Sequence, residues 1–319
     1  MVMVEFKVSE FEHGMSLEKF CKKKLSNAPS SIFFKLFRKR DVKVNGKREK
    51  ENFEVQENDI IQIFITKQQE LDFLKPSSPK NIDLNFGTDL EVIYEDLNLI
   101  IVNKPKGLLT VSDINEKKII LVNKVNAYLK SKGFNFDAIP IHRIDKNTRG
   151  LVMFAKNQKT LNYFNDLLKT KEKITKHYFA LVKGKTESKG TINKPLYKDE
   201  KANIVKVDNV RGKESLTIYN TLKSNGKYSL VDVNLVTGRT HQIRVHFSSI
   251  SHPLIGDKKY GDKELNDYFH KKYNHDFQFL IAYKIKFGKL ENEFEYLSNK
   301  KFEIGFTEKE KRILKDLNL

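Results

Sequence analysis

A single carboxylate stands among several basic side chains in residues 139–155, which read IPIHRIDKNTRGLVMFA. The carboxylate is Asp145, and its neighbours are His142, Arg143 and Arg149. Positive charges within a few ångströms keep a carboxylate ionised and oriented, as a nucleophile or general base requires. A surface turn held by a salt bridge gives the same pattern. The segment alone therefore favours an active-site aspartate and an ordinary ion pair about equally.

Two other segments place glycine, polar and basic residues between apolar stretches. Residues 103–109, NKPKGLL, form a tight loop whose lysines can meet phosphate. Residues 237–260 hold a second group of candidates, namely Gly238, Arg239, His241, Arg244 and His246. If residues 239–247 form a strand, Arg244 lies on its polar face. From there it can pair with Asp145 or with RNA.

Charge is the informative part of the composition. The 319 residues contain 59 Lys and Arg against 41 Asp and Glu, a net charge of +18. Such a surplus favours a polyanionic partner, nucleic acid or an anionic membrane surface, although a generally lysine-rich composition also produces it. Cys21 is the only cysteine, which excludes an internal disulfide and cysteine-based metal sites. With no signal peptide or apolar run of ~20 residues, we expect a cytoplasmic protein without a membrane partner.

Short elements are expected along the first 65 residues. They are a strand at 1–8, a helix after the N-cap Ser16, a helix after 29–31, a hairpin at Asn45-Gly46 and a strand pair at 53–65. The second helix and the hairpin share a basic face made of Lys35, Arg38, Lys39, Arg40 and Lys43. This αα–ββ order resembles the S-four-type RNA-binding domain, which implies that the basic face grips RNA phosphates. The alternative is a solvated basic helix in an unrelated module.

The rest of the chain predicts a linker and a larger domain. We place a small RNA-binding domain at 1–66, a linker at 67–88 and a catalytic domain at 89–319, because Gln, Pro, Ser and Gly interrupt any periodicity in the middle stretch. Strands are expected on both sides of the Glu95-Asp96 turn and at 177–184, 217–224, 228–236, 239–247 and 279–287, with helices at 117–133, 158–171 and 262–272. The fold class is α+β with a mixed, mainly antiparallel sheet.

Four motifs then appear in order across residues 90–290. They are N-K-P-x-G-L, H-R-I-D-x-x-T-x-G-L, G-R-T-H-Q-I-R-V-H and H-P-L-I-G-D-x-x-Y-G. Together they resemble the RluA-type pseudouridine synthases. The resemblance implies an enzyme that isomerises uridine in RNA to pseudouridine without a cofactor. An S-four-type domain ahead of this region resembles the members that modify large-subunit ribosomal RNA.

The resemblance also implies roles for individual residues. Asp145 matches the essential aspartate, and Arg244 would hold its carboxylate by an ion pair. Tyr178, in the K-x-Y position, would lie against the target uracil and act as general base. Arg143 would enter the RNA stack in place of the flipped uridine, and Leu280 would pack beside the base. His142, Arg239 and His241 are expected to contact RNA.

Several positions depart from the family pattern, and other functions stay open. Arg149 stands where many relatives have serine, and Ile281 replaces a common histidine. The alternatives are a non-catalytic RNA- or ribosome-binding protein and a synthase acting on tRNA. The joint presence of aspartate, tyrosine and arginine argues against the first. A metal site built from His241, His246 and His252 has no acidic or cysteine partner at ligand spacing, so no metal is expected. We expect a monomer.

Overall fold

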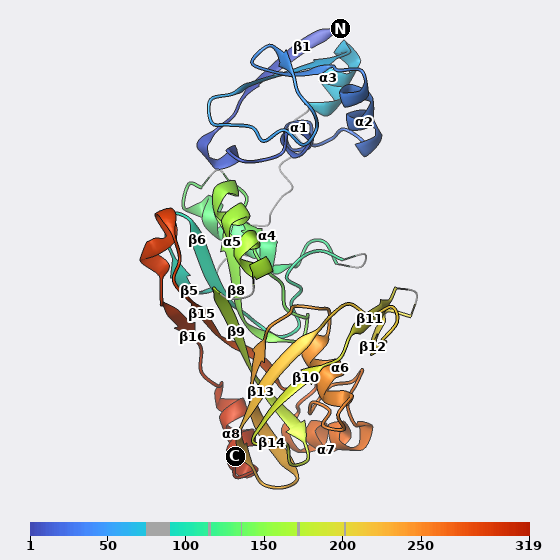
Figure 1. The fold of residues 1–319 in the computed structure, drawn as a ribbon, viewed down its shortest axis with the longest axis vertical. Helices are drawn as coiled ribbons and strands as arrows, with labels where there is room; N and C mark the ends of the chain where they lie inside the picture. The colour runs from blue at the N-terminus through green and yellow to red at the C-terminus, as the bar shows by residue number, and fades with distance from the viewer. Residues whose placement is uncertain (75–89, 114–115, 135, 171–172, 201) are drawn as a thin grey trace.

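The computed structural model describes residues 1–74, 90–113, 116–134, 136–170, 173–200 and 202–319. They form a small N-terminal unit and a larger C-terminal unit, stacked along the long axis of the molecule (Figure 1). The two units touch where η1 (Glu10–Glu12) meets α5 (Gln158–Thr170). Asn162 Nδ2 donates to the carbonyl of Gly14 over 3.0 Å, and the Phe11 ring packs edge-on against Phe134.

The N-terminal unit is an antiparallel sheet covered by helices. Its strand order is β1 (Val2–Lys7), β4 (Ile60–Ile65), β2 (Val42–Val44) and β3 (Lys47–Arg48). Helices α1 (Leu17–Lys24) and α2 (Ser30–Arg38) bury Phe20 and Phe33 against it. The predicted N-cap and turn are both confirmed. Ser16 Oγ accepts from the amide of Lys19, and Asn45 and Gly46 adopt φ of 50° and 81° between β2 and β3.

Two expectations for this unit are wrong. Residues 53–59 form a turn instead of a strand, because the Asp59 carboxylate accepts the amide of Gln56 and Asn58 has a φ of 69°. The first part of the predicted linker is a helix, α3 (Lys67–Phe73). A capping box of Thr66 and Gln69 starts this helix, and the Phe73 side chain is buried in the N-terminal core. The rest of that linker, 75–88, lies outside the described residues.

The C-terminal unit is built on one large sheet, as predicted. Its strand order is β10 (Lys189–Asn193), β13 (Leu216–Ser224), β14 (Tyr228–Leu235), β9 (Ile174–Lys183), β15 (Leu280–Phe287), β8 (Arg149–Ala155), β6 (Leu99–Lys104) and β5 (Glu91–Glu95). Two short strands, β7 (Ile139–Pro140) and β16 (Lys301–Glu303), pair with β8 and β15. Along this order the pairs are antiparallel except β15 with β8, which is parallel.

Strand β15 joins two halves of this sheet. It pairs with β8 through Ile281 and Ala282, and with β9 through Leu280 and its neighbours. The approach to β8 is close, because a Cβ atom on Gly150 would lie 2.3 Å from the carbonyl oxygen of Ala282. Gly150 also has a φ of 133°, so only glycine fits there. The strands that flank the Asp145 loop and carry Tyr178 are therefore held together through β15.

Helices and one hairpin complete the C-terminal unit. They are α4 (Leu121–Ser131), α5, α6 (Gln242–Ser248), α7 (Lys263–Tyr273), α8 (Glu308–Asp316), η3 (Asn292–Leu297) and the hairpin of β11 (Leu196–Asp199) with β12 (Ile204–Val207). The predicted helices at 117–133, 158–171 and 262–272 are confirmed, the first starting four residues later than expected. Within the described part of the chain, no helix is long and apolar enough to cross a membrane.

The strand predicted at 239–247 is wrong, because most of this segment is helix α6. Ile243 and Phe247 face the main core, whereas Val245 faces a second apolar cluster formed by the β11–β12 hairpin. The polar residues between them are buried too. The alternating pattern therefore reflects a helix that is covered on several sides, and it does not indicate a strand with one solvated face.

Candidate active site

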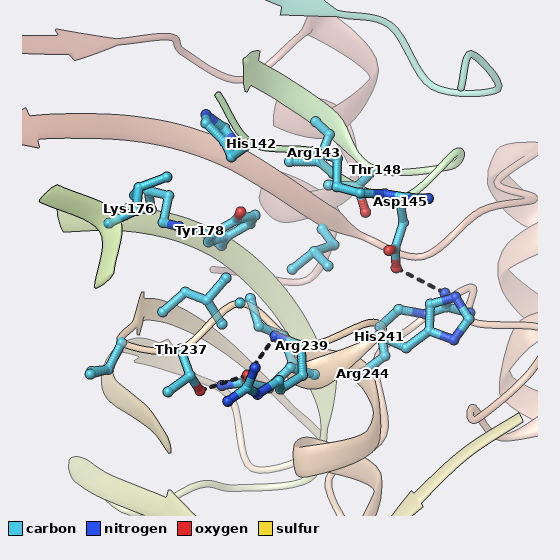
Figure 2. A pocket seen from close by; sticks show the side chains of 18 of the residues that line it. His142, Arg143, Asp145, Thr148, Lys176, Tyr178, Thr237, Arg239, His241 and Arg244 are labelled. Atoms are coloured by element: carbon cyan, nitrogen blue, oxygen red, sulfur yellow. Dashed lines mark hydrogen bonds and ion pairs between the residues drawn. The ribbon is translucent and has the colours of Figure 1, made fainter. Parts of the chain in front are cut away.

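The predicted site residues meet around a pocket of about 550 Å³. It opens between the Asp145 loop, strand β9, the start of β15 and the N-terminal end of α6 (Figure 2). Its walls include Arg143, Asp145, Tyr178, Arg244 and Leu280. Among the described residues that line it, Asp145 is the single acid.

Arg244 connects two carboxylates at one side of this pocket. Its Nη1 donates to Asp145 Oδ2 over 3.0 Å, while Nε and Nη2 donate to the two oxygens of Asp257 over 2.7 and 2.9 Å. Arg244 and Asp257 are buried. Burial opposes the charged guanidinium, but the two aspartates outweigh it and raise the pKa of Arg244. The ion pair predicted between Arg244 and Asp145 is present.

The loop that carries Asp145 is fixed by hydrogen bonds on both sides of the aspartate. The buried Lys104 ammonium donates to the carbonyls of Pro105, Leu108 and Lys146 over 2.9, 2.7 and 2.9 Å. Thr110 Oγ1 exchanges hydrogen bonds with the backbone of Ile144. The Asp145 side chain keeps 24% of its surface exposed. The carboxylate is thus aimed by Arg244 and still accessible to a ligand.

Tyr178 and Leu280 form an apolar wall opposite the carboxylate. They come from the neighbouring strands β9 and β15. Burial, reinforced by the charge of Asp145, raises the pKa of the Tyr178 phenol, so the free enzyme keeps it protonated at neutral pH. Within the described residues its hydroxyl makes no hydrogen bond. This wall therefore presents an apolar surface with one phenol hydroxyl to the pocket.

Two histidines near the pocket are neutral. Burial lowers the pKa of His142 to about 3, and the Lys176 charge adds to the effect. Burial also lowers the pKa of His241 to about 4, against the opposing charge of Asp145. His241 adopts left-handed backbone angles, φ 54° and ψ 18°, and its Nδ1 lies 2.8 Å from the Tyr260 hydroxyl. The expectation that His142 adds positive charge beside Asp145 is wrong, although both histidines line the pocket.

Arg149 points away from the site. Its Nη2 lies 2.6 Å from Glu310 of α8 and donates to the carbonyl of Gly305 over 3.0 Å. Lys106 Nζ approaches the same carboxylate to 3.4 Å. Arg149 and Glu310 are both buried. Arg149 therefore fixes α8 to the start of β8 through its ion pair with Glu310. Its closeness to Asp145 in the sequence does not bring its side chain into the site.

The remaining predicted RNA contacts fall into two groups. Arg143 and Arg239 are both exposed and both line the pocket, and Arg239 Nε donates to the carbonyl of Glu214. The second group lies on the N-terminal unit, on or next to α2 and β2, away from α6 (Figure 1). Its members are Lys35, Arg38, Lys39, Arg40 and Lys43. The structure does not bring this second group to the pocket.

Sequence reasoning missed three residues that shape the site. Asp257 holds the far side of Arg244, and its only signal was the Gly-Asp pair in the last motif. Gln242 accepts the amide of Arg239 over 3.0 Å and donates to Thr217 over 2.9 Å, a role hidden by the strand prediction. Lys176 lines the pocket two residues before Tyr178.

The described residues contain no group of three or more His, Cys, Asp or Glu placed to hold a metal ion. The histidines considered for such a site have other partners. Both His246 ring nitrogens are engaged, by Thr217 and by the carbonyl of Lys194, and His252 Nδ1 lies 2.8 Å from the carbonyl of Lys183.

Known proteins resemble the chain over most of its length. The family model for RNA pseudouridylate synthase matches residues 98–249. The chain is 32% identical over 290 residues to the ribosomal large subunit pseudouridine synthase C of Vibrio parahaemolyticus, covering 90% of this chain and 89% of that protein. It is 29% identical over 307 residues to an uncharacterised RNA pseudouridine synthase of Mycoplasma capricolum, covering 93% and 96%.

A solved structure agrees with the fold of the C-terminal unit. Human RNA pseudouridylate synthase domain containing 4 superposes with a TM-score of 0.58 at 21% identity, covering 72% of this chain and 93% of that one. The mixed, mainly antiparallel fold predicted from the sequence is thereby confirmed. The chain belongs to the RluA-type family of RNA pseudouridine synthases, and it is an isomerase that acts on RNA.

Proposed function

We propose that the chain converts specific uridines of large-subunit ribosomal RNA to pseudouridine, with Asp145 as the essential group. Several relatives at about one-third identity are ribosomal large subunit pseudouridine synthases by name, which supports this RNA class. The observation that carries the role of Asp145 is its placement. Its carboxylate is held at the pocket by the buried Arg244–Asp257 pair and faces the Tyr178 side of the pocket.

This arrangement suits the isomerisation. The bond between C1′ and N1 of uridine breaks, the uracil turns, and a bond between C1′ and C5 forms. The C5 proton leaves and N1 gains a proton, so no net redox change occurs. Asp145 acts on the reacting nucleotide as nucleophile or as a negative charge that stabilises the sugar, a task that carboxylates perform in glycosidases. Tyr178 borders the base and moves a proton to or from it.

Flipping and binding fall to residues outside this pair. A base must leave the stack at a cost of roughly a few kcal/mol, which contacts along the RNA offset. Arg143, exposed at the pocket and without an ion pair among the described residues, fills the vacated space. The basic face of the N-terminal unit binds phosphates, so that unit serves as an RNA-binding domain.

Replacing Asp145 by asparagine tests the proposal. The D145N protein should bind large-subunit ribosomal RNA with nearly wild-type affinity and form no pseudouridine. Asp137, an exposed acid eight residues earlier, provides the matched control, and D137N should keep full activity. Pseudouridine formation by purified D145N protein would show that the mechanism is wrong. Modification of tRNA but not of ribosomal RNA by the wild-type enzyme would overturn the substrate assignment.

Two further proposals concern the oligomeric state of the enzyme and its cellular compartment. We also propose that the enzyme is active as a monomer. The single cysteine, Cys21, is buried and free, which fits a reducing cytoplasm. Light scattering at working concentrations checks the first inference: activity that appears only with dimer formation would contradict it.

A further inference from the structure

Lys176 presents an uncompensated positive charge to the active-site pocket. It precedes Tyr178 by two residues on β9, so both side chains project from the same face of the strand. A Cβ atom placed on Gly238 would lie 3.9 Å from Lys176 Nζ, which puts the ammonium against the opposite wall of the pocket. Among the described residues it has no acidic partner, and burial alone lowers its pKa to about 8. At neutral pH it stays mostly charged.

A second donor without a partner lies beside it. His142 Nε2 accepts the backbone amide of Met153 over 3.3 Å, so the neutral ring carries its proton on Nδ1. That Nδ1 is fully enclosed and has no hydrogen-bond partner in the described structure. Native proteins seldom leave buried donors unsatisfied, and exceptions often mark a functional site. Within the described residues, Lys176 and His142 thus line a part of the pocket that holds two donors without protein partners and no acidic group.

This wall lies opposite the reacting carboxylate. Figure 2 shows Lys176, His142 and Tyr178 together on one side of the pocket, with Asp145, Arg244 and His241 on the other. Positions two apart on a strand are separated by roughly 7 Å. A base that extends from Asp145 along Tyr178 therefore points its far edge towards the side of the pocket that Lys176 lines.

Resting on the proposed function, we propose that Lys176 donates a hydrogen bond to a carbonyl oxygen of the target uracil and stabilises the base while it is detached from the sugar. When the C1′–N1 bond breaks, its electron pair goes to the uracil and the negative charge spreads onto O2 and O4. A fixed cation in a partly enclosed pocket stabilises such charge strongly. A phosphate oxygen next to the flipped nucleotide can accept the same hydrogen bond from Lys176. The test must therefore distinguish a contact to the uracil carbonyl from a contact to this phosphate.

The test uses synthetic RNA carrying uridine, 2-thiouridine or 4-thiouridine at the modified position, because sulfur is a poor hydrogen-bond acceptor. Wild-type enzyme should convert one of the two thio-substrates much more slowly than uridine. Lys176→Met should lower kcat on uridine about 100-fold or more. It should also remove the penalty of the thio substitution, since coupled changes are not additive. Lys176→Arg, which keeps the charge, should retain part of the rate.

Lys183→Met is the matched control, since Lys183 lies on the same strand outside the pocket and pairs with Asp262. It should behave as wild type. The proposal fails if Lys176→Met keeps wild-type kcat. It also fails if that variant mainly loses affinity, lowers the salt dependence of binding by about one charge and keeps the thio penalty, because these results identify a phosphate contact.

One measurement uses wild-type enzyme alone, so its result does not depend on whether a variant folds. If wild-type enzyme converts both thio-substrates at the rate of uridine, no carbonyl contact limits the reaction and the proposal is wrong. Conversion of uridine by wild-type enzyme and its loss in D145N report on the proposed function separately. The role of Lys176 can therefore fail while that function stands.

Discussion

The cations of the N-terminal unit and those of the pocket are the same residue types in opposite settings. Lys35, Arg38, Lys39 and Arg40 are exposed, and none forms an ion pair among the described residues. Arg244 is buried between two carboxylates. An exposed cation exchanges water and counterions for phosphate at little cost, whereas a buried guanidinium held at three nitrogens keeps one geometry. Under the proposed function, the first group would supply affinity for RNA and the second would hold Asp145 in position.

Replacing Arg244, the buried cation, should have the largest effect on stability and on kcat. Arg244→Ala leaves the buried Asp257 carboxylate without its cation, with only the backbone amides of Lys259 and Tyr260 as donors, and loss of one member of a buried pair costs about 3–5 kcal/mol of stability. Arg244→Lys keeps a charge but cannot bridge both carboxylates. We expect kcat to fall at least about 100-fold in Arg244→Lys with RNA affinity preserved. Single-turnover rates and melting curves measure both, and a wild-type kcat in this variant would contradict the positioning role.

Replacing the exposed cations of the N-terminal unit should lower the affinity for RNA and nothing else. A variant with glutamine at Lys35, Arg38, Lys39 and Arg40 should bind RNA about tenfold or more weakly at physiological salt. The slope of log K against log salt should flatten by roughly 0.7–0.9 for each phosphate that the variant no longer neutralises. At saturating RNA, kcat should not change. The control removes four exposed lysines from α7 and α8, namely Lys263, Lys271, Lys311 and Lys315. An equal loss of affinity in that control would mean that total charge matters and the location does not.

The pair of Arg149 and Glu310 tests whether burial without access to the pocket gives a purely structural role. Glu310→Gln leaves Arg149 and Lys106 without their anion, so the free energy of unfolding should fall by about 3 kcal/mol. The kcat of the folded enzyme should stay within about threefold of wild type. Denaturant unfolding and initial rates below the melting range give the two values. A large loss of kcat with unchanged stability would instead tie α8 to catalysis.

Glu12 gives the smallest expected effect, a pH dependence. Burial would raise the pKa of Glu12, but hydrogen bonds from Lys24 and Lys23 outweigh it and lower the pKa to about 2. An acid whose pKa falls on folding stabilises the protein above its unfolded value, near 4.5, and this stabilisation is lost as the pH falls towards 2. Glu12→Gln should flatten that part of the stability curve. Unfolding followed between pH 2 and 6 checks this; parallel curves would contradict it.

The sequence predicted local features well and three-dimensional pairings poorly. The Asn45-Gly46 turn and the Ser16 cap need only neighbouring residues, and both are present. The pairing of Arg244 with Asp145 joins residues 99 positions apart. The residue pattern left Asp145 and RNA open as partners, and the family resemblance favoured Asp145. The second partner of Arg244, Asp257, was missed because one carboxylate seemed a sufficient partner. Arg149 was placed beside Asp145 because its real partner, Glu310, lies 161 residues away.

Segment 239–247 shows why the alternation of apolar and polar residues predicted the wrong secondary structure next to the pocket. A period-2 pattern predicts a strand only if one face meets solvent. Here Gln242 and His246 are buried and hydrogen-bonded to Thr217, so polar character no longer indicates exposure. The prediction for His142 failed for the same reason. Its sequence context suggested a cation, but enclosure makes it neutral.

The position of β15 also sets the order in which the enzyme can assemble during synthesis. Its first residue, Leu280, emerges 97 positions after Lys183, the last residue of β9. At ordinary translation rates about 5–20 seconds pass between the two. Until β15 arrives, β8 and β9 each lack a neighbour, and unpaired strand edges are prone to aggregate. The strand that follows the Asp145 loop and the strand that carries Tyr178 are therefore joined in one sheet only after β15 has been synthesised.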